Sequence, residues 1–204
     1  PIVDMENYTN PYNEKEELFN TKNSWEYYFK QTSNYKLNEV YKSKNVIFSD
    51  TDYYHKMQYR IHLEPKFKLF LNKEIKLQDR YYKFLYDFLK KKNLNKKKIL
   101  GIHFRGTSYK TSRGHIFPAT KQQIKKNVDY LLKIKKFDKI FICTEEKNYL
   151  NFFKKNYPEK LLYIDTFRSD KNDAFKVYNR VNHRFLLGDE AIKEALILSK
   201  CSSL

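Results

Sequence analysis

The chain has 204 residues, and its 41 lysines and arginines against 24 aspartates and glutamates give a formal net charge of +17. Hydrophobic residues make up 41% of it and aromatic residues 17%, which is enough for a core and excludes an intrinsically disordered chain. No apolar run approaches the roughly 18 residues of a membrane-spanning helix, and no signal peptide is visible at the start.

The first 97 residues are predicted to form a partial α/β domain with few regular elements. The segment 6–60 is expected to be mostly irregular, with an aromatic cluster at 24–29 that is typical of core under a loop or of a lid, and less often of a sugar platform. The expected elements, in chain order, are a strand at 1–5, a helical turn at 37–41, a strand at 45–48, and one or two amphipathic helices within 65–92. The polar, basic stretch 93–98 is the expected boundary between domains 1–97 and 98–204.

From residue 98 onward, short apolar runs alternate with amphipathic stretches. The expected elements are strands at 98–104, 139–144 and 161–165, helices at 120–134, 146–156 and 188–201, and loops at 105–117 and 166–187. Thr120 is a suitable N-cap for the first of these helices. The alternation predicts an α/β fold with βαβ crossovers and a Rossmann-type parallel sheet. A further strand is expected to begin at 202–204, and both ends look like cuts in a longer protein.

Ligands of parallel sheets bind beyond the carboxyl ends of the strands, so the segments that follow the three predicted strands are expected to converge. The first strand ends in the run 103–108, His-Phe-Arg-Gly-Thr-Ser. The Arg105 guanidinium can hold two phosphate oxygens, and Gly106 lets the backbone approach a ligand. His103 lies on the same side of the strand as Arg105, and Thr107 and Ser108 add hydroxyl groups. A structural ion pair of Arg105 and a buried, satisfied His103 are the alternative interpretations.

The run 101–109 resembles the His-x-Arg motif of the fucosyltransferase superfamily, which includes α1,6-, nodulation-type and protein O-fucosyltransferases. Three more segments resemble that superfamily in the same order: 140–146, an apolar strand that ends in Thr and acidic residues; 157–165, a Tyr-Pro pair and the next strand; and 190–201, a helix that ends in Leu-Ser-Lys-Cys. The resemblance covers 98–204 and is more general over the first 97 residues.

The resemblance implies a GT-B-like glycosyltransferase that uses a GDP-sugar donor, inverts the anomeric centre, and needs neither a metal ion nor a separate cofactor. It places Arg105 on the donor diphosphate, where its charge also stabilises the GDP leaving group, and His103 nearby. Thr144 and Glu145 would lie beside the nucleotide. Glu194 falls where the family contacts guanine, whose N1–H and N2–H donors suit a carboxylate.

The general base of the transfer is not assigned by the sequence. The loop 110–115 contains no carboxylate, and His115 is either that base or an exposed loop histidine. Other loops offer Asp4, Glu26 and Asp170. A basic segment between the third strand and the last helix fits either an anionic ligand or solvated surface; its members are Arg168, Arg180, His183 and Arg184.

These features predict a cytoplasmic glycosyltransferase that transfers fucose to a glycan or a lipid-linked saccharide in surface polysaccharide or glycan biosynthesis. The positive charge also fits peripheral contact with an anionic membrane, or the codon bias of an AT-rich genome. A nucleic-acid-binding module is a weaker alternative, because no such motif is present. The other alternative is an inactive protein with a transferase fold that binds a glycan or a nucleotide. Two cysteines, Cys143 and Cys201, are too few for a disulfide framework, lack metal-site spacing, and indicate a reducing compartment.

Overall fold

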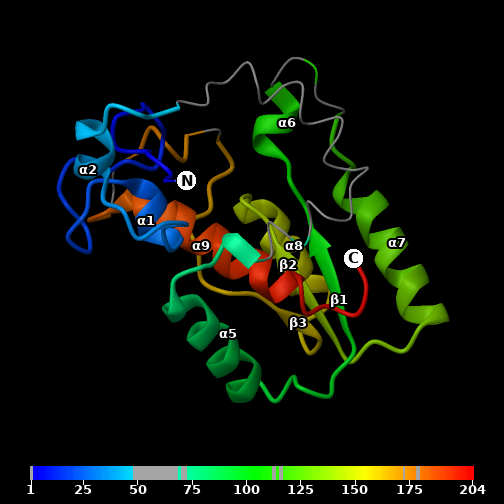
Figure 1. Ribbon diagram of the computed structural model, residues 1–204. Helices are drawn as coiled ribbons and strands as arrows, with labels where there is room; N and C mark the ends of the chain where they lie inside the picture. Colours follow the sequence, from blue (N-terminus) through cyan, green and yellow to red (C-terminus); the bar gives the residue numbers. More distant parts are fainter. Residues whose placement is uncertain are drawn as a thin grey trace. The chain divides into compact units, whose positions relative to one another are not determined.

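A computed structural model describes residues 2–47, 69, 73–111, 114, 117–171, 173–177 and 180–204, without the side chains of Ser108 and Thr111 (Figure 1). The chain divides into two compact units, Pro1–Asp79 and Arg80–Leu204. This division falls directly after Asp79, the first residue of the helix α5, Asp79–Lys91, whereas the basic stretch 93–98 suggested a boundary beyond this helix. The reason is packing, because Leu85 of α5 belongs to the same buried cluster as Ile99 of the following strand.

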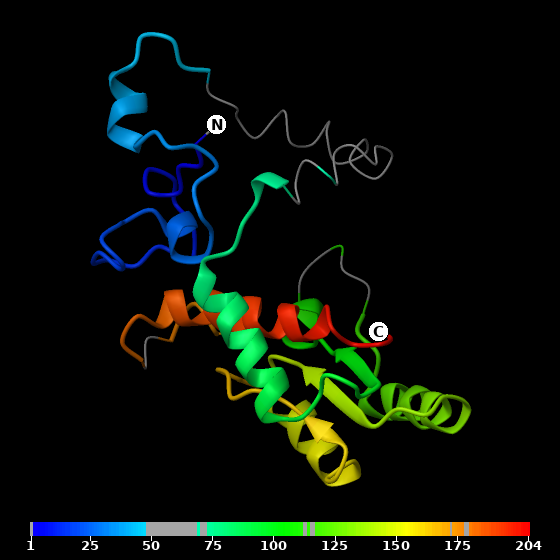
Figure 2. The same cartoon turned by 60° about the horizontal axis from the view of Figure 1, so that its bottom comes forward.

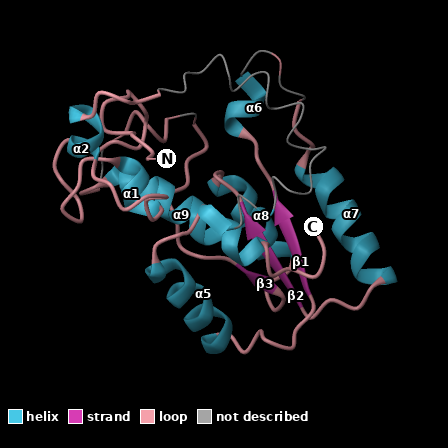
Figure 3. Cartoon of the chain, in the orientation of Figure 1, coloured by secondary structure: helices cyan, strands magenta, loops and turns pink. Residues whose placement is uncertain are grey.

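The second unit contains the predicted parallel sheet. Its strands are β1, Ile99–His103, β2, Lys139–Cys143, and β3, Leu161–Leu162, in the order β1-β2-β3. Figure 3 shows the strands with helices on both sides. The remaining helices of this unit are α6, Thr107–Thr111, α7, Lys121–Ile134, α8, Lys147–Asn156, and α9, His183–Leu198.

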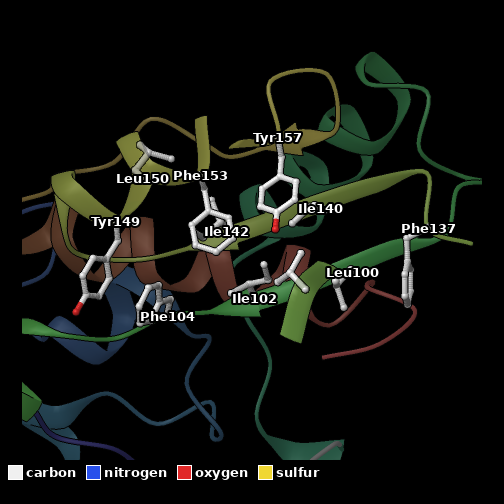
Figure 4. Packing of buried hydrophobic residues seen from close by; sticks show 11 residues of the cluster. Leu100, Ile102, Phe104, Phe137, Ile140, Ile142, Tyr149, Leu150, Phe153 and Tyr157 are labelled. Carbon is white, nitrogen blue, oxygen red and sulfur yellow. The ribbon is translucent and has the colours of Figure 1, made fainter. Parts of the chain in front are cut away.

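Alternate residues of the strands build a separate core on each face of the sheet. Leu100 and Ile142 pack with residues of α7 and α8, including Val128 and Phe153, as Figure 4 shows for most of this cluster. On the other face, Ile99 and Phe141 pack with Leu85 of α5 and with Ile197 of α9. Each fully buried side chain of this kind contributes about 1.5–3 kcal/mol to folding. Because both faces of the sheet are packed, the carboxyl ends of the strands are held in fixed positions relative to one another.

Local signals predicted α7 and α8 closely. Thr120 caps α7 as expected: its side chain accepts from Gln123 N, while the Gln123 side chain accepts from Thr120 N, a complete capping box. Three other boundaries differ from the expectation. The short helix α6 lies within the predicted loop 105–117, and α9 begins at His183 rather than at Gly188. The strand predicted at 161–165 is paired only at Leu161–Leu162.

The chain after α9 returns to the open edge of β1, where a further strand was expected to begin. Gly101 N donates to Ser203 O at 2.8 Å, and Ser202 N donates to Ile99 O at 2.8 Å, on the edge away from β2. A Cβ at Gly101 would come within 2.6 Å of a Leu204 methyl carbon and 3.0 Å of Cys201 Sγ. A larger residue at position 101 would therefore require the Leu204 and Cys201 side chains to shift.

The first unit is largely irregular, as expected, with the short helices α1, Ser24–Tyr28, and α2, Leu37–Lys42. The aromatic cluster around α1 contributes to the core of this unit, because Tyr27 and Tyr28 are buried. The helical turn predicted at 37–41 is confirmed by α2. The later of the predicted helices within 65–92 is confirmed by α5, whereas most of 65–72 lies outside the described residues.

Two strands predicted in this unit are wrong where the structure describes them. Residues 2–5 and 45–47 are not in strands, and Phe48 lies outside the described residues. Side-chain amides take the place of a partner strand at 2–5. Val3 N donates to Gln31 Oε1 at 3.0 Å, and Val3 O accepts from Asn23 Nδ2 and Gln31 Nε2 at 2.8 Å each.

Candidate functional site

The segments that follow the three strands do converge at one edge of the sheet. Phe104 N donates to Cys143 O at 2.9 Å, which sets the segments after β1 and β2 side by side. The chain beyond β3 joins them through Ser169 N, which donates to Glu145 O at 2.9 Å. This edge therefore gathers side chains that are far apart in the sequence.

Arg105, Gly106 and Thr107 all face the carboxylate of Glu145. Gly106 N and Thr107 Oγ1 donate to Glu145 Oε1 at 3.2 and 3.0 Å. Arg105 Nε lies 3.8 Å from Glu145 Oε2, and the guanidinium carbon is 4.9 Å from the centre of the Tyr109 ring. The Arg105 side chain is 46% exposed, and an ion pair this exposed and this long is weak. Its guanidinium is therefore available to a stronger anionic partner.

His103 ends β1 and is exposed, so the alternative of a buried histidine is wrong. Thr144 is buried, and its Oγ1 accepts from Glu146 N at 3.2 Å. Ser108 lies within α6, and its side chain is outside the described part. Five of the predicted donor residues thus stand together at the ends of β1 and β2: His103, Arg105, Gly106, Thr107 and Glu145.

An ion pair that the sequence did not indicate, between the buried Glu146 and the exposed Lys110, lies directly beside Gly106. Glu146 is 3% exposed, and Lys110 Nζ donates to its Oε1 at 2.7 Å. A Cβ at Gly106 would lie 2.0 Å from this same carboxylate oxygen. Gly106 is required here by the approach of Glu146, so its place in the motif has a structural cause besides access for a ligand.

Arg168 is the main difference from the expected basic loop, since it is buried and not solvated. Its Nε donates to Thr144 O at 3.0 Å, and its two terminal nitrogens donate to Thr166 O at 3.3 Å and Ile164 O at 3.0 Å. Two of these three bonds go to backbone carbonyls of the segment after β3. Arg168 therefore fastens the turn after β2 to the segment after β3.

Glu194 of α9 is the partner of Arg168, and both are buried. Its Oε1 accepts from Arg168 Nη2 at 3.1 Å, and its Oε2 accepts from Cys143 Sγ at 2.8 Å. Burial raises the pKa of Glu194, although the Cys143 hydrogen bond and the Arg168 charge act in the opposite direction. Burial also raises the pKa of the Cys143 thiol, so it stays protonated and donates. Glu194 is thus held within an internal network.

Other charged residues of the segment 166–187 are also held internally. Arg180 is paired with Glu190 and donates from Nε to His183 Nδ1 at 3.1 Å. His183 is 1% exposed and bonds through Nε2 to Ala174 O. Asp170 accepts from Asn148 N, in the first turn of α8. Much of the basic segment is therefore a structural network rather than a solvated surface.

The candidates for a general base are divided between the two units. Asp4 and Glu26 belong to the first unit, where Asp4 accepts from Glu6 N and Glu26 accepts from Gln31 Nε2. His115 lies outside the described residues. Within the described residues, no three His, Cys, Asp or Glu side chains gather as a metal-binding group would require.

Comparison with solved structures identifies the architecture. The chain matches NodZ α-1,6-fucosyltransferase co-crystallised with GDP at a TM-score of 0.50 and 14% identity, over 81% of this chain and 49% of that one. The fold is similar to that of about half of NodZ. Two further NodZ structures, one soaked with GDP-fucose and one from Bradyrhizobium, match at TM-scores of 0.48 and 0.44, with 16% and 14% identity, over 72% and 81% of this chain and 42% and 50% of those.

The GT-B-like α/β fold expected from the sequence is confirmed by the NodZ match. The chain spans about half the length of NodZ. No family model matches the chain, and no curated protein does. None of the helices that the structure describes is long and apolar enough to span a bilayer.

Proposed function

We propose that the protein is a glycosyltransferase that transfers fucose from GDP-fucose to a glycan acceptor with inversion. The observation that carries the proposal is the half-exposed Arg105 guanidinium at the carboxyl ends of β1 and β2. It stands in a chain with the fold of an enzyme co-crystallised with GDP. We place the reaction in the biosynthesis of a surface polysaccharide or another glycan.

Arg105 is proposed to bind the donor diphosphate in a two-pronged contact and to stabilise the charge that builds on GDP as it leaves. A fixed guanidinium performs this electrostatic work without a divalent ion, and the proposal therefore includes metal independence. His103 donates to the donor from the same end of β1. Gly106, Thr107 and Ser108 line the diphosphate with backbone and hydroxyl groups.

Thr144 and Glu145 are proposed to border the nucleotide, and Glu194 to lie on the side of the guanine base. Both oxygens of Glu194 already accept hydrogen bonds from Arg168 and Cys143. A direct contact with guanine N1–H and N2–H therefore requires Glu194 to share or release one of these partners.

The acceptor is proposed to be a glycan or a lipid-linked saccharide bound partly by the first unit. That unit contains a hollow of about 870 Å³, whose lining includes Asp4 and the rings of Tyr8, Tyr35 and Tyr41. Tyrosine rings pack on the apolar faces of sugars while carboxylates accept from their hydroxyls. The free thiols of Cys143 and Cys201 fit the reducing cytoplasm, which we propose as the location.

Calorimetric titration of the protein with GDP, UDP and ADP tests the donor class. Selective binding of GDP is expected, because guanine alone among the three bases presents two adjacent N–H donors. Equal binding of all three would overturn the GDP-sugar proposal, because the site would then not recognise guanine. Binding of none would overturn it in favour of a protein that binds only a glycan or a partner.

Glu145→Gln is expected to bind GDP about five-fold tighter than the unchanged protein. The carboxylate of Glu145 occupies the hydrogen-bond donors of Gly106 and Thr107 and lies beside Arg105, so a diphosphate has to compete with it. The amide keeps the size of the side chain and removes the negative charge.

The same titration of Glu159→Gln provides the matched control, since Glu159 is an exposed carboxylate just before β3, at the opposite edge of the sheet. The control is expected to match the unchanged protein. Weaker GDP binding by Glu145→Gln would contradict this expectation. It would show that the Glu145 carboxylate attracts the ribose hydroxyl groups of GDP more than it repels the diphosphate.

A further inference from the structure

Three connections that are separated in the sequence have a strong excess of positive charge over negative charge. They are 90–98, 133–139 and 154–160, and together they hold thirteen lysines and two carboxylates within a chain of net charge +17. We call these lysines the lysine edge; its members are Lys90, Lys91, Lys92, Lys96, Lys97, Lys98, Lys133, Lys135, Lys136, Lys139, Lys154, Lys155 and Lys160.

The parallel sheet brings the three connections together, because each of them leads into the start of a strand. Asp138 N donates to Lys98 O at 2.8 Å, which joins the connections before β1 and β2. Ile140 N donates to Lys160 O at 2.9 Å, which joins the connection before β3 to the start of β2. Figures 1 and 2 show all three at one edge of the sheet, below the strands in the first view.

Few negative charges oppose these lysines. Every member of the lysine edge is exposed except Lys139, which is half-buried. Of the two carboxylates, Asp138 accepts from Lys98 N at 2.8 Å and lies 3.8 Å from Lys97 Nζ. The hydrogen bond from Lys98 N holds the pKa of Asp138 below its ordinary value, and the nearby lysines act in the same direction. The net field of this edge is strongly positive.

Exposed apolar side chains border the same edge. Tyr86 of α5 is 62% exposed one turn before Lys90, whose Nζ lies 5.8 Å from the centre of the Tyr86 ring. On α7, Tyr130 is 62% exposed and Ile134, the last residue of the helix, is 53% exposed between Lys133 and Lys135. Lysines that alternate with exposed tyrosine and isoleucine are typical of surfaces that meet lipid headgroups.

We propose that the lysine edge docks the protein on an anionic lipid surface. Lysine is a compact, strongly hydrated charge that fits a diffuse layer of negative headgroups, whereas the fork of arginine suits individual phosphates of a nucleic acid, and this edge contains no arginine. When the lysine edge faces the membrane, the headgroup layer receives the exposed side chains of Tyr86, Tyr130 and Ile134. Docking through this edge leaves Arg105, at the opposite ends of the strands, accessible to a donor. The proposal does not depend on the identity of that donor.

Co-sedimentation with vesicles tests the proposal. The protein is expected to bind vesicles of phosphatidylcholine mixed with phosphatidylglycerol and not vesicles of phosphatidylcholine alone. A triple variant, Lys96→Glu with Lys136→Glu and Lys155→Glu, changes one exposed lysine in each connection. Its binding to the anionic vesicles is expected to be at least about 100-fold weaker, because each lysine near such a surface strengthens partition about five-fold.

The matched control is Lys15→Glu with Lys22→Glu and Lys44→Glu, which makes the same change in net charge at exposed lysines of the first unit. Its vesicle binding is expected to fall by much less. Equal loss in both triple variants would overturn the proposal, because it would show that only the total charge matters. Absence of binding to anionic vesicles, or tighter binding to a mixed-sequence oligonucleotide with the same loss in the first variant, would also overturn it.

Titration of both triple variants with GDP separates this inference from the proposed function. Unchanged GDP binding by the first variant, together with lost vesicle binding, is the expected result and shows that the fold is intact. If no form of the protein binds GDP while the vesicle results are as expected, the donor assignment fails and the lysine edge stands.

Discussion

Replacing Arg105 by alanine is expected to weaken GDP binding by about 10- to 100-fold. A charge-assisted contact of a guanidinium with a diphosphate is worth about 1.5–3 kcal/mol, and the half-exposed Arg105 has a long, weak ion pair with Glu145 and a contact with the Tyr109 ring to lose. Calorimetric titration of the variant and of the unchanged protein measures the difference. Because the native ion pair is weak, the free energy of unfolding is expected to change by less than about 1 kcal/mol.

Two further variants make this result specific. Arg105→Lys keeps the positive charge but loses the planar fork, and its GDP affinity is expected to lie between those of the alanine variant and the unchanged protein. Lys96→Ala removes an exposed cation from the opposite edge of the same sheet and is expected to leave GDP binding unchanged. Equal losses in Lys96→Ala and Arg105→Ala would mean that GDP responds to overall charge, and the assignment of Arg105 would then be wrong.

Arg168→Ala is expected to lower the free energy of unfolding by about 3–5 kcal/mol. The change leaves the Glu194 carboxylate buried without its cation, and it frees the carbonyls of Thr144, Thr166 and Ile164 from their donors. Denaturation by urea, followed by far-UV circular dichroism, measures this loss.

The double variant Arg168→Met with Glu194→Leu is the matched control for the buried ion pair. It removes both charges and keeps apolar volume in their place, so it is expected to recover much of the stability lost by Arg168→Ala. A double variant that is even less stable than Arg168→Ala would contradict the view that the uncompensated charge of Glu194 is the main cost.

Glu194 has two proposed roles, and they predict different effects. As the partner of Arg168 it stabilises the fold, whereas as a guanine contact it discriminates GDP from ADP. The arrangement of α9 was only partly predictable, because the sequence predicts a helix from Gly188 and the helix in fact begins at His183. The network of Arg168, Glu194 and Cys143 joins positions that are far apart in the sequence, and no local pattern indicates such a contact.

Elements that depend on neighbouring residues were predicted well. The capping box of Thr120 and Gln123 fixes the start of α7, and the alternation of apolar runs and amphipathic stretches yields the parallel sheet with helices on both sides. The motif around Arg105 was also visible, since a strand followed by Arg-Gly at its carboxyl end places both at the ligand-binding edge. The prediction of strands at 2–5 and 45–47 was wrong because the apolar residues of these segments resemble those of strands. The backbone at 2–5 is instead hydrogen-bonded by distant amide side chains such as those of Asn23 and Gln31.

The amino-acid sequence alone determined the α/β class, the order of the three strands of the sheet and the position of the Arg105 motif, because each of these follows from residues within one turn or one strand. Only the tertiary structure decided that Arg168 is buried, that Gly106 is required by Glu146, and that three short runs of lysine form one edge. Pairing β1 with β2 and β2 with β3 brings distant residues into contact, and the energies of such contacts depend on burial and distance. Neither burial nor distance is present in a local pattern.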